Sequence, residues 1–134
     1  YLLDDLKIPP PAPGPAFGRV AYHASCHMRA AGVTRQPREL LRRIPGVEFV
    51  EMRDADRCAG GAGTYGIKDP ETSEAIFGRK RRGIEGSGAE IVATSCPACM
   101  IQLNNGLRGS RRVMHVAQVL AEAYGLLAKR DSGA

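Results

Sequence analysis

The feature that most limits how this chain can fold is a regular alternation of short apolar runs with longer helix-like segments. Runs suited to strands occur at residues 19–23, 47–52, 91–95 and 112–114, and the run over 91–95 is of the buried type. Segments with helical periodicity separate them, and strands joined through helices form parallel sheets with right-handed crossovers. The sequence therefore predicts an α/β fold, with a small, mostly parallel sheet and helices on both of its faces.

The helix boundaries are marked by residues with known end preferences. Pro37 suits the first turn of a helix over 37–43, and Asp69-Pro70-Glu71 combines an N-cap residue, a first-turn proline and an acid. That second helix is expected to run to about Glu85, where glycines 86 and 88 stop it. Further helices are expected over 97–107, beginning at Pro97, and over 115–129.

The chain of 134 residues fits one domain of ordinary size. Residues 8–18 hold five of the nine prolines, which exclude helix and interior strand. We expect a proline-rich linker or arm over 1–18, the folded domain over 19–128, and a polar tail over 129–134.

Composition excludes several classes of function. Aromatic residues are 5% of the chain and tryptophan is absent, so stacking platforms for single-stranded nucleic acid are not expected. The net charge of +5 arises mainly from arginine runs, which we interpret as solvated helix faces rather than a nucleic-acid surface. No apolar run approaches the roughly 18 residues of a membrane helix. No carboxylate pair or Ser/His/Asp arrangement suited to hydrolysis stands out.

Four cysteines follow the predicted strands. Cys26 comes after the first strand, Cys58 lies in the loop after the second, and Cys96 and Cys99 follow the third. The carboxyl ends of parallel strands share one edge, where open α/β sheets bind ligands. We therefore expect the four thiols to meet at this edge, in a reducing, cytoplasmic setting where clustered cysteines are ligands or redox groups.

The segment Cys96-Pro97-Ala98-Cys99 places two thiols at a predicted helix N-terminus, where thiolate is stabilised. The pair can ligate a metal centre, or it can be a thioredoxin-like dithiol. Only 35 residues follow Cys99, whereas a thioredoxin-like motif normally comes early in its domain, so we favour ligation.

A glycine-rich segment follows Cys58. Residues 61–66 match the dinucleotide spacing GxGxxG, but the segment neither leaves a strand directly nor enters a helix. We expect instead that the loop brings backbone N–H groups close to a bulky centre. The three histidines, His23, His27 and His115, are expected to cap or hydrogen-bond. Because Cys26 and His27 would point in opposite directions on extended chain, they are not expected to share a centre.

Together, the cysteines and the sequence around them resemble the cysteine-rich CCG domain. That family has a lone cysteine, a CCG motif and a CxxC motif, and here Cys26, Cys58-Ala59-Gly60 and Cys96–Cys99 lie at matching separations. The resemblance covers about residues 19–124, and its segments are YHASCH (22–27), PRELL (37–41), CAGGAGTY (58–65) and TSCPACMIQLNNG (94–106).

The resemblance implies an iron–sulfur domain of an oxidoreductase subunit rather than a complete enzyme. The domain occurs in heterodisulfide reductase and in iron–sulfur subunits of glycolate oxidase, lactate utilisation and anaerobic glycerol-3-phosphate dehydrogenase. It implies a [4Fe–4S] cluster held by Cys26, Cys58, Cys96 and Cys99, with Gly60, Gly61 and Gly63 packed against it. Ala59 replaces the second motif cysteine, so the five-cysteine noncubane cluster of some relatives is not expected here.

The partners implied by the resemblance are a flavin-containing dehydrogenase subunit and a ferredoxin-like segment before residue 1. Electrons would pass from a hydroxy acid or glycerol phosphate, oxidised on the partner, to a quinone or disulfide acceptor. The complex would be cytoplasmic or at the inner face of the membrane. Two alternatives remain open: a zinc-binding or metal-free docking module, and a CPxC dithiol redox protein.

Overall fold

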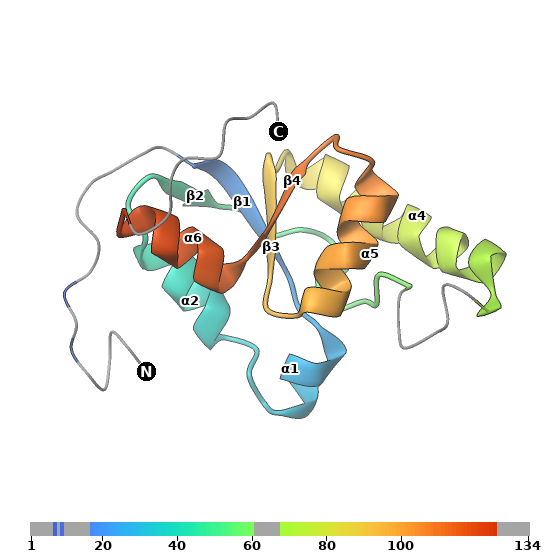
Figure 1. Cartoon of the computed structure of the whole chain (residues 1–134), viewed down its shortest axis with the longest axis horizontal. Helices are drawn as coiled ribbons and strands as arrows, with labels where there is room; N and C mark the ends of the chain where they lie inside the picture. Colours follow the sequence, from blue (N-terminus) through green and yellow to red (C-terminus); the bar gives the residue numbers. More distant parts are fainter. Residues whose placement is uncertain (1–6, 8, 10–16, 61–67, 126–134) are drawn as a thin grey trace.

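Four parallel strands form one sheet in the order β2-β1-β3-β4 in the computed structural model, which describes residues 7, 9, 17–60 and 68–125 (Figure 1). The strands are β1 (Gly18–His23), β2 (Val47–Phe49), β3 (Ile91–Thr94) and β4 (Arg112–His115). All three pairings are parallel. This confirms the predicted α/β class and places β1 and β3 side by side in the middle of the sheet.

Five helices in the described residues flank the sheet: α1 (Cys26–Ala30), α2 (Gln36–Arg43), α4 (Pro70–Ser87), α5 (Pro97–Leu107) and α6 (Val116–Ala123). The predicted start of α4 is confirmed, because the Asp69 carboxylate accepts the Thr72 N–H and Pro70 opens the first turn. Gly88 ends α4 with φ +70°, and α5 has the predicted bounds.

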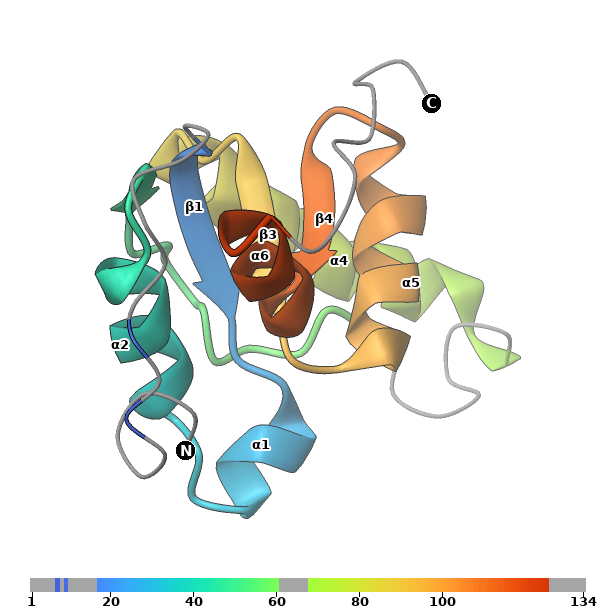
Figure 2. The same cartoon turned by 60° about the vertical axis from the view of Figure 1, so that its left-hand side comes forward.

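Helices cover both faces of the sheet, as the sequence predicts (Figure 2). One core lies between the sheet and helices α2 and α6, and it includes Val20 and Tyr22 of β1. The other lies between the sheet and helices α4 and α5, and it includes Ala21 and Val92. Successive residues of β1 thus alternate between two cores, so the central strands are apolar on both faces.

Three elements differ from expectation. Strand β2 ends at Phe49 instead of reaching Met52. Helix α6 ends at Ala123, where the expected helix continued to residue 129; Gly125, with φ +72°, follows the end of α6 and breaks the helix. Helix α1 is not among the helices expected from the sequence. It forms because the Ser25 hydroxyl accepts the Met28 N–H at the N-cap.

The chain path makes the carboxyl ends of β1 and β3 a natural place for a ligand. The connection after β1 leads to β2 on one side, and the connection after β3 leads to β4 on the other side. Ligands of open α/β sheets bind where neighbouring strands send their connections in opposite directions. Helices α1 and α5 begin beyond this point (Figure 1).

Two contacts extend the domain before β1. Phe17 is buried in the core with α2 and α6, and its N–H donates to the Gly46 carbonyl at 2.8 Å. The Tyr124 hydroxyl donates to the Pro9 carbonyl at 2.7 Å. Among the described residues, no helix has both the length and the apolar character needed to cross a bilayer.

Candidate metal centre

All four cysteines line one cavity at the carboxyl edge of the sheet. None of them is in a disulfide bond. Three separate segments supply them: the start of α1, the loop after β2, and the start of α5. The cavity wall is completed by His23, His27, Arg29, Ala59, Ala98 and Gln102.

Cys26 is the first residue of α1, two residues beyond Ala24, which is buried in the core with α2 and α6. The Ala24 N–H donates to the Ala55 carbonyl at 3.1 Å and joins this segment to the loop that leads to Cys58. Because α1 is helical, the expectation that Cys26 and His27 diverge is wrong. Both line the cavity, with the Cys26 Sγ 4.0 Å from the His27 Nδ1.

Cys58 is held by a tight turn. The Gly60 N–H donates to the Cys58 Sγ at 3.2 Å, and the Ser73 hydroxyl of α4 donates to the Gly60 carbonyl at 2.8 Å. Gly60 has φ +90°, and a Cβ there would lie 2.7 Å from the Ser73 carbonyl oxygen. Glycine is therefore required at position 60 by conformation and by space. Gly61 and Gly63, also predicted for this site, lie outside the described residues.

Cys96 and Cys99 are at the N-terminus of α5, where Cys96 is the N-cap residue. Burial, followed by the neighbouring Cys96 thiol, raises the pKa of Cys99 to about 12. Cys26 and Cys58 also oppose ionisation of Cys99. A bound cation reverses this balance, because it stabilises all of the thiolates at once.

Two buried polar groups lie at the ends of the central strands. His23 of β1 and Thr94 of β3 are partners in register, and both are at most 1% exposed. Neither the His23 Nδ1 nor the Thr94 Oγ1 has a hydrogen-bond partner among the described residues. Burial, together with Lys80 and Arg29, lowers the pKa of His23 to about 3, so this imidazole is neutral at pH 7.

Sequence patterns do not mark several of the residues around the cavity as members of the site. The Gln102 amide of α5 donates to the Ala59 carbonyl at 3.0 Å and contacts the Ser73 hydroxyl at 3.3 Å. Gln102 lies one helical turn after Cys99, and this spacing is the signal that could have placed it on the same helix face. Ser73 and Arg29 carry no comparable signal in the sequence.

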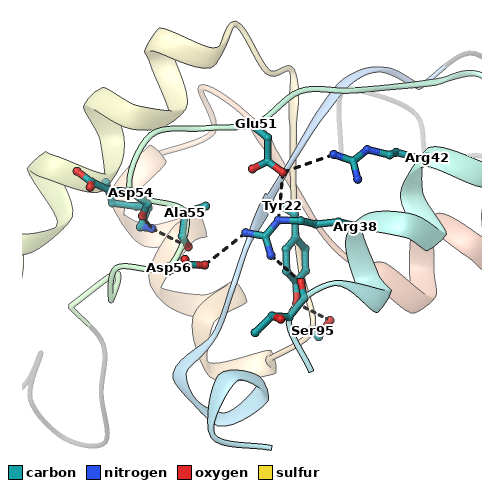
Figure 3. Close-up of polar contacts among 10 residues, drawn as sticks. Tyr22, Arg38, Arg42, Glu51, Asp54, Ala55, Asp56 and Ser95 are labelled. Carbon is teal, nitrogen blue, oxygen red and sulfur yellow. Dashed lines mark hydrogen bonds and ion pairs between the residues drawn. The ribbon is translucent and has the colours of Figure 1, made fainter. Parts of the chain in front are cut away.

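A network of charged side chains around Arg38 contacts the segment that leads from β2 to Cys58 (Figure 3). Arg38 of α2 lies between Glu51 and Asp56, at 3.2 Å and 3.3 Å from their carboxylate oxygens. Its guanidinium also lies over the Tyr22 ring, 5.4 Å from the centroid. The Tyr22 hydroxyl in turn is 3.2 Å from the Ser95 Oγ, one residue before Cys96. Arg38 therefore connects the segment before Cys58 with the segment before Cys96.

The donor set suits a centre held by thiolates. Four thiols surround the cavity, and thiolates bind zinc or iron–sulfur clusters. In residues 17–60 and 68–125, however, no three His, Cys, Asp or Glu side chains converge as the ligands of a single ion must. Ala59, 2% exposed, occupies the wall of the cavity beside Cys58 and adds a methyl group but no ligand.

Comparison with known proteins gives relatives that are oxidoreductase subunits. The chain is 39% identical over 112 residues to the probable glycolate oxidase iron-sulfur subunit of Bacillus subtilis, covering 79% of the chain and 25% of that protein. It is 42% identical over 123 residues to a subunit of the anaerobic glycerol-3-phosphate dehydrogenase of Escherichia coli, covering 89% of the chain and 30% of that protein.

A third relative comes from Methanothermobacter marburgensis. A subunit of its fumarate reductase (CoM/CoB) is 35% identical over 127 residues, which cover 91% of the chain and 25% of that protein. The chain thus spans between 25% and 30% of the length of these three relatives. The family model described as CCG, cysteine-rich domain, matches residues 20–104 and so includes all four cysteines. The chain belongs to the cysteine-rich CCG domain family.

Proposed function

We propose that this domain holds a [4Fe–4S] cluster on Cys26, Cys58, Cys96 and Cys99 and transfers electrons within an oxidoreductase complex. The observation that carries the proposal is the meeting of four thiols from three separate segments in one cavity at the switch point of the sheet. The family supports it, because relatives of this chain include a protein named as an iron-sulfur subunit.

The number of thiols favours this cluster over a free dithiol, and the relatives favour it over zinc. A [4Fe–4S] cluster takes four cysteine ligands, and Ala59 leaves four in this cavity. Zinc can also take four thiolates, and the relative named as an iron-sulfur subunit favours the cluster. Four thiols on one cavity, rather than two, make the free-dithiol alternative the weaker one.

Each part of the cavity has a role in holding such a group. The thiolates would ligate it, and the Gly60 N–H would donate to the Cys58 sulfur and weaken its negative charge. When bound, the cluster would supply a group that accepts and releases single electrons. His23, neutral at pH 7, would present a polar group at the buried side of the cavity without adding charge.

The relatives suggest the complex in which the domain works. We propose that a flavin-containing dehydrogenase partner oxidises a small hydroxy acid or glycerol phosphate and passes the electrons to this domain. A quinone or a disulfide would accept them. A ferredoxin-like segment of the same complex would lie between the flavin and this domain, and the complex would reach the membrane through its partners.

Anaerobic purification followed by analysis of iron, acid-labile sulfide and zinc tests the cluster. About four iron and four sulfide per chain, with visible absorbance, are expected. Replacing any of the four cysteines by serine should lower the iron content, whereas Met100→Ala, next to Cys99, should not. One zinc per chain without colour would instead support the docking module. Reduction of insulin disulfides by the metal-free protein would support the dithiol.

A further inference from the structure

Lys80 of α4 is a buried cation that contacts the loop leading to Cys58. Its side chain is 1% exposed, and its ammonium donates to the backbone carbonyls of Asp54 at 2.5 Å and Ala55 at 3.3 Å. Within residues 17–60 and 68–125, no carboxylate lies within ion-pair distance of this ammonium. A buried charge is costly unless an opposite charge compensates it, and carbonyl groups are neutral.

The backbone is arranged to bring Lys80 to this position. Gly83 lies one turn later on α4, and a Cβ there would collide with the Arg53 carbonyl oxygen. The helix therefore approaches the loop more closely than a larger residue would permit. Asp54 has φ +59°, an uncommon conformation outside glycine, and the chain turns there so that two successive carbonyls face the ammonium. Figure 3 shows Asp54, Ala55 and Asp56 in this turn.

The turn connects Lys80 with two of the cysteine-bearing segments. The Ala55 carbonyl also accepts the Ala24 N–H, two residues before Cys26, and Ala55 lies three residues before Cys58. Burial lowers the pKa of Lys80 to about 8, while the carboxylates of Asp54 and Asp56 and, after them, the thiolates of Cys58 and Cys99 act to raise it. The ammonium is thus within electrostatic reach of two thiols as well as two carboxylates.

We propose that Lys80 is a positioning residue and the internal counter-charge of the cysteine site. Its ammonium offsets part of the negative charge that ionised thiolates and their bound cluster place in the cavity, and it fixes the turn before Cys58. The charge role rests on the proposed cluster. The positioning role belongs to the folded chain whether or not a cluster is bound.

Variants of Lys80 separate these two roles. Lys80→Arg keeps the charge, Lys80→Gln keeps a donor without charge, and Lys80→Met has neither. A positive charge stabilises the more negative, reduced cluster, so the midpoint potential should fall in Lys80→Gln and stay near the wild-type value in Lys80→Arg. Arg82→Gln removes a charge from an exposed position on the same helix and is the matched control. An unchanged potential in Lys80→Gln, or an equal fall in Arg82→Gln, would overturn the charge role.

Hydrogen exchange in metal-free protein tests the positioning role and needs no cluster. The amides of residues 55–60 should exchange about tenfold faster or more in Lys80→Met than in the wild type, because hydrogen bonds from a charged donor are lost. Lys80→Arg and Arg82→Gln should resemble the wild type. Equal exchange in all four proteins would refute the positioning role. Failure of the wild type to bind iron would refute the proposed function, but the exchange rates of the metal-free proteins would still decide the positioning role.

A further measurement uses only the wild type and Lys80→Arg, which both have a basic side chain at position 80, in case the neutral variants do not fold. The wild-type midpoint potential should fall as pH rises through the range in which Lys80 loses its proton, and the potential of Lys80→Arg should remain level there. Parallel curves would overturn the charge role. The titratable groups that face Lys80 and are common to both proteins are His23 of β1, Asp54, Asp56 and Cys58 of the loop after β2, and Cys99 of α5.

Discussion

The Gln102 side-chain amide donates to the Ala59 carbonyl at 3.0 Å, across 43 residues of sequence. This bond joins the helix that carries Cys96 and Cys99 to the loop that carries Cys58. The same amide contacts the Ser73 hydroxyl of α4. Gln102 therefore holds together three elements that meet at the cavity, and its loss should affect the loop more than the sheet.

Gln102→Met should loosen the Cys58 loop while preserving the volume of the side chain. Loss of the two hydrogen bonds should lower the free energy of unfolding by about 1–2 kcal/mol. Urea unfolding of metal-free protein measures this, and the rate of iron loss to a chelator should increase. Asn105→Ala, at an exposed position on the same helix, should neither lower the free energy of unfolding nor speed the loss of iron. Equal stability of the two variants would contradict the role of Gln102.

Ala59→Cys should add a fifth thiol to the cavity wall. Ala59 is 2% exposed and packs against the core under α4 and α5, so the larger side chain should cost about 1 kcal/mol or less of stability. We expect the iron content or the visible spectrum to change under anaerobic conditions. The control is Ala93→Cys, which is buried on the opposite face of the sheet. Identical spectra of Ala59→Cys and the wild type would show that position 59 does not reach the centre.

Gly106→Ala should destabilise the packing of α5 on α4. A Cβ at Gly106 would overlap the ring of Phe77, which is fully buried. We expect a net loss of about 1–3 kcal/mol in thermal or urea unfolding, because the ring has no space to move. Gly86→Ala is the matched control on α4, since no atom lies within 4 Å of its Cβ. That control should gain up to about 1 kcal/mol from helix propensity. A stabilising Gly106→Ala would disprove the close approach.

Acid should destabilise the metal-free protein through His23. Its pKa is about 3 in the folded protein, against an ordinary value of 6.5, so only the unfolded chain binds a proton between these values. Stability should therefore fall as pH drops through this window, by about 2 kcal/mol between pH 7 and pH 5. Urea unfolding at several pH values measures the slope.

The variant His23→Gln should flatten the pH dependence in this range. Carboxylates contribute equally to both proteins, so the difference between the two curves isolates the imidazole. His27→Gln removes an exposed histidine at the same cavity and should keep the wild-type slope. If the curves of His23→Gln and the wild type are parallel, His23 is not buried as a neutral group.

The order and type of most elements could be predicted because they depend on local patterns. Pro70 and Gly88 mark the ends of α4, and Pro97 marks the start of α5. Helix α1 could not be predicted, since it has only five residues and its cap at Ser25 carries no periodic signal around it. The early end of α6 follows from one conformation, the positive φ of Gly125, which outweighs the apolar pattern that continues past it.

The amino-acid sequence by itself determined that four cysteines would follow three parallel strands, because strand order in the chain sets which ends share an edge. It also determined the family, through the spacing of those cysteines. Only the tertiary structure decided which residues support them. Lys80, Ser73 and Gln102 lie far from Cys58 in the chain, and they reach its loop because α4 and α5 pack against the same face of the sheet. Contacts of this kind depend on helix packing, which local sequence patterns do not encode.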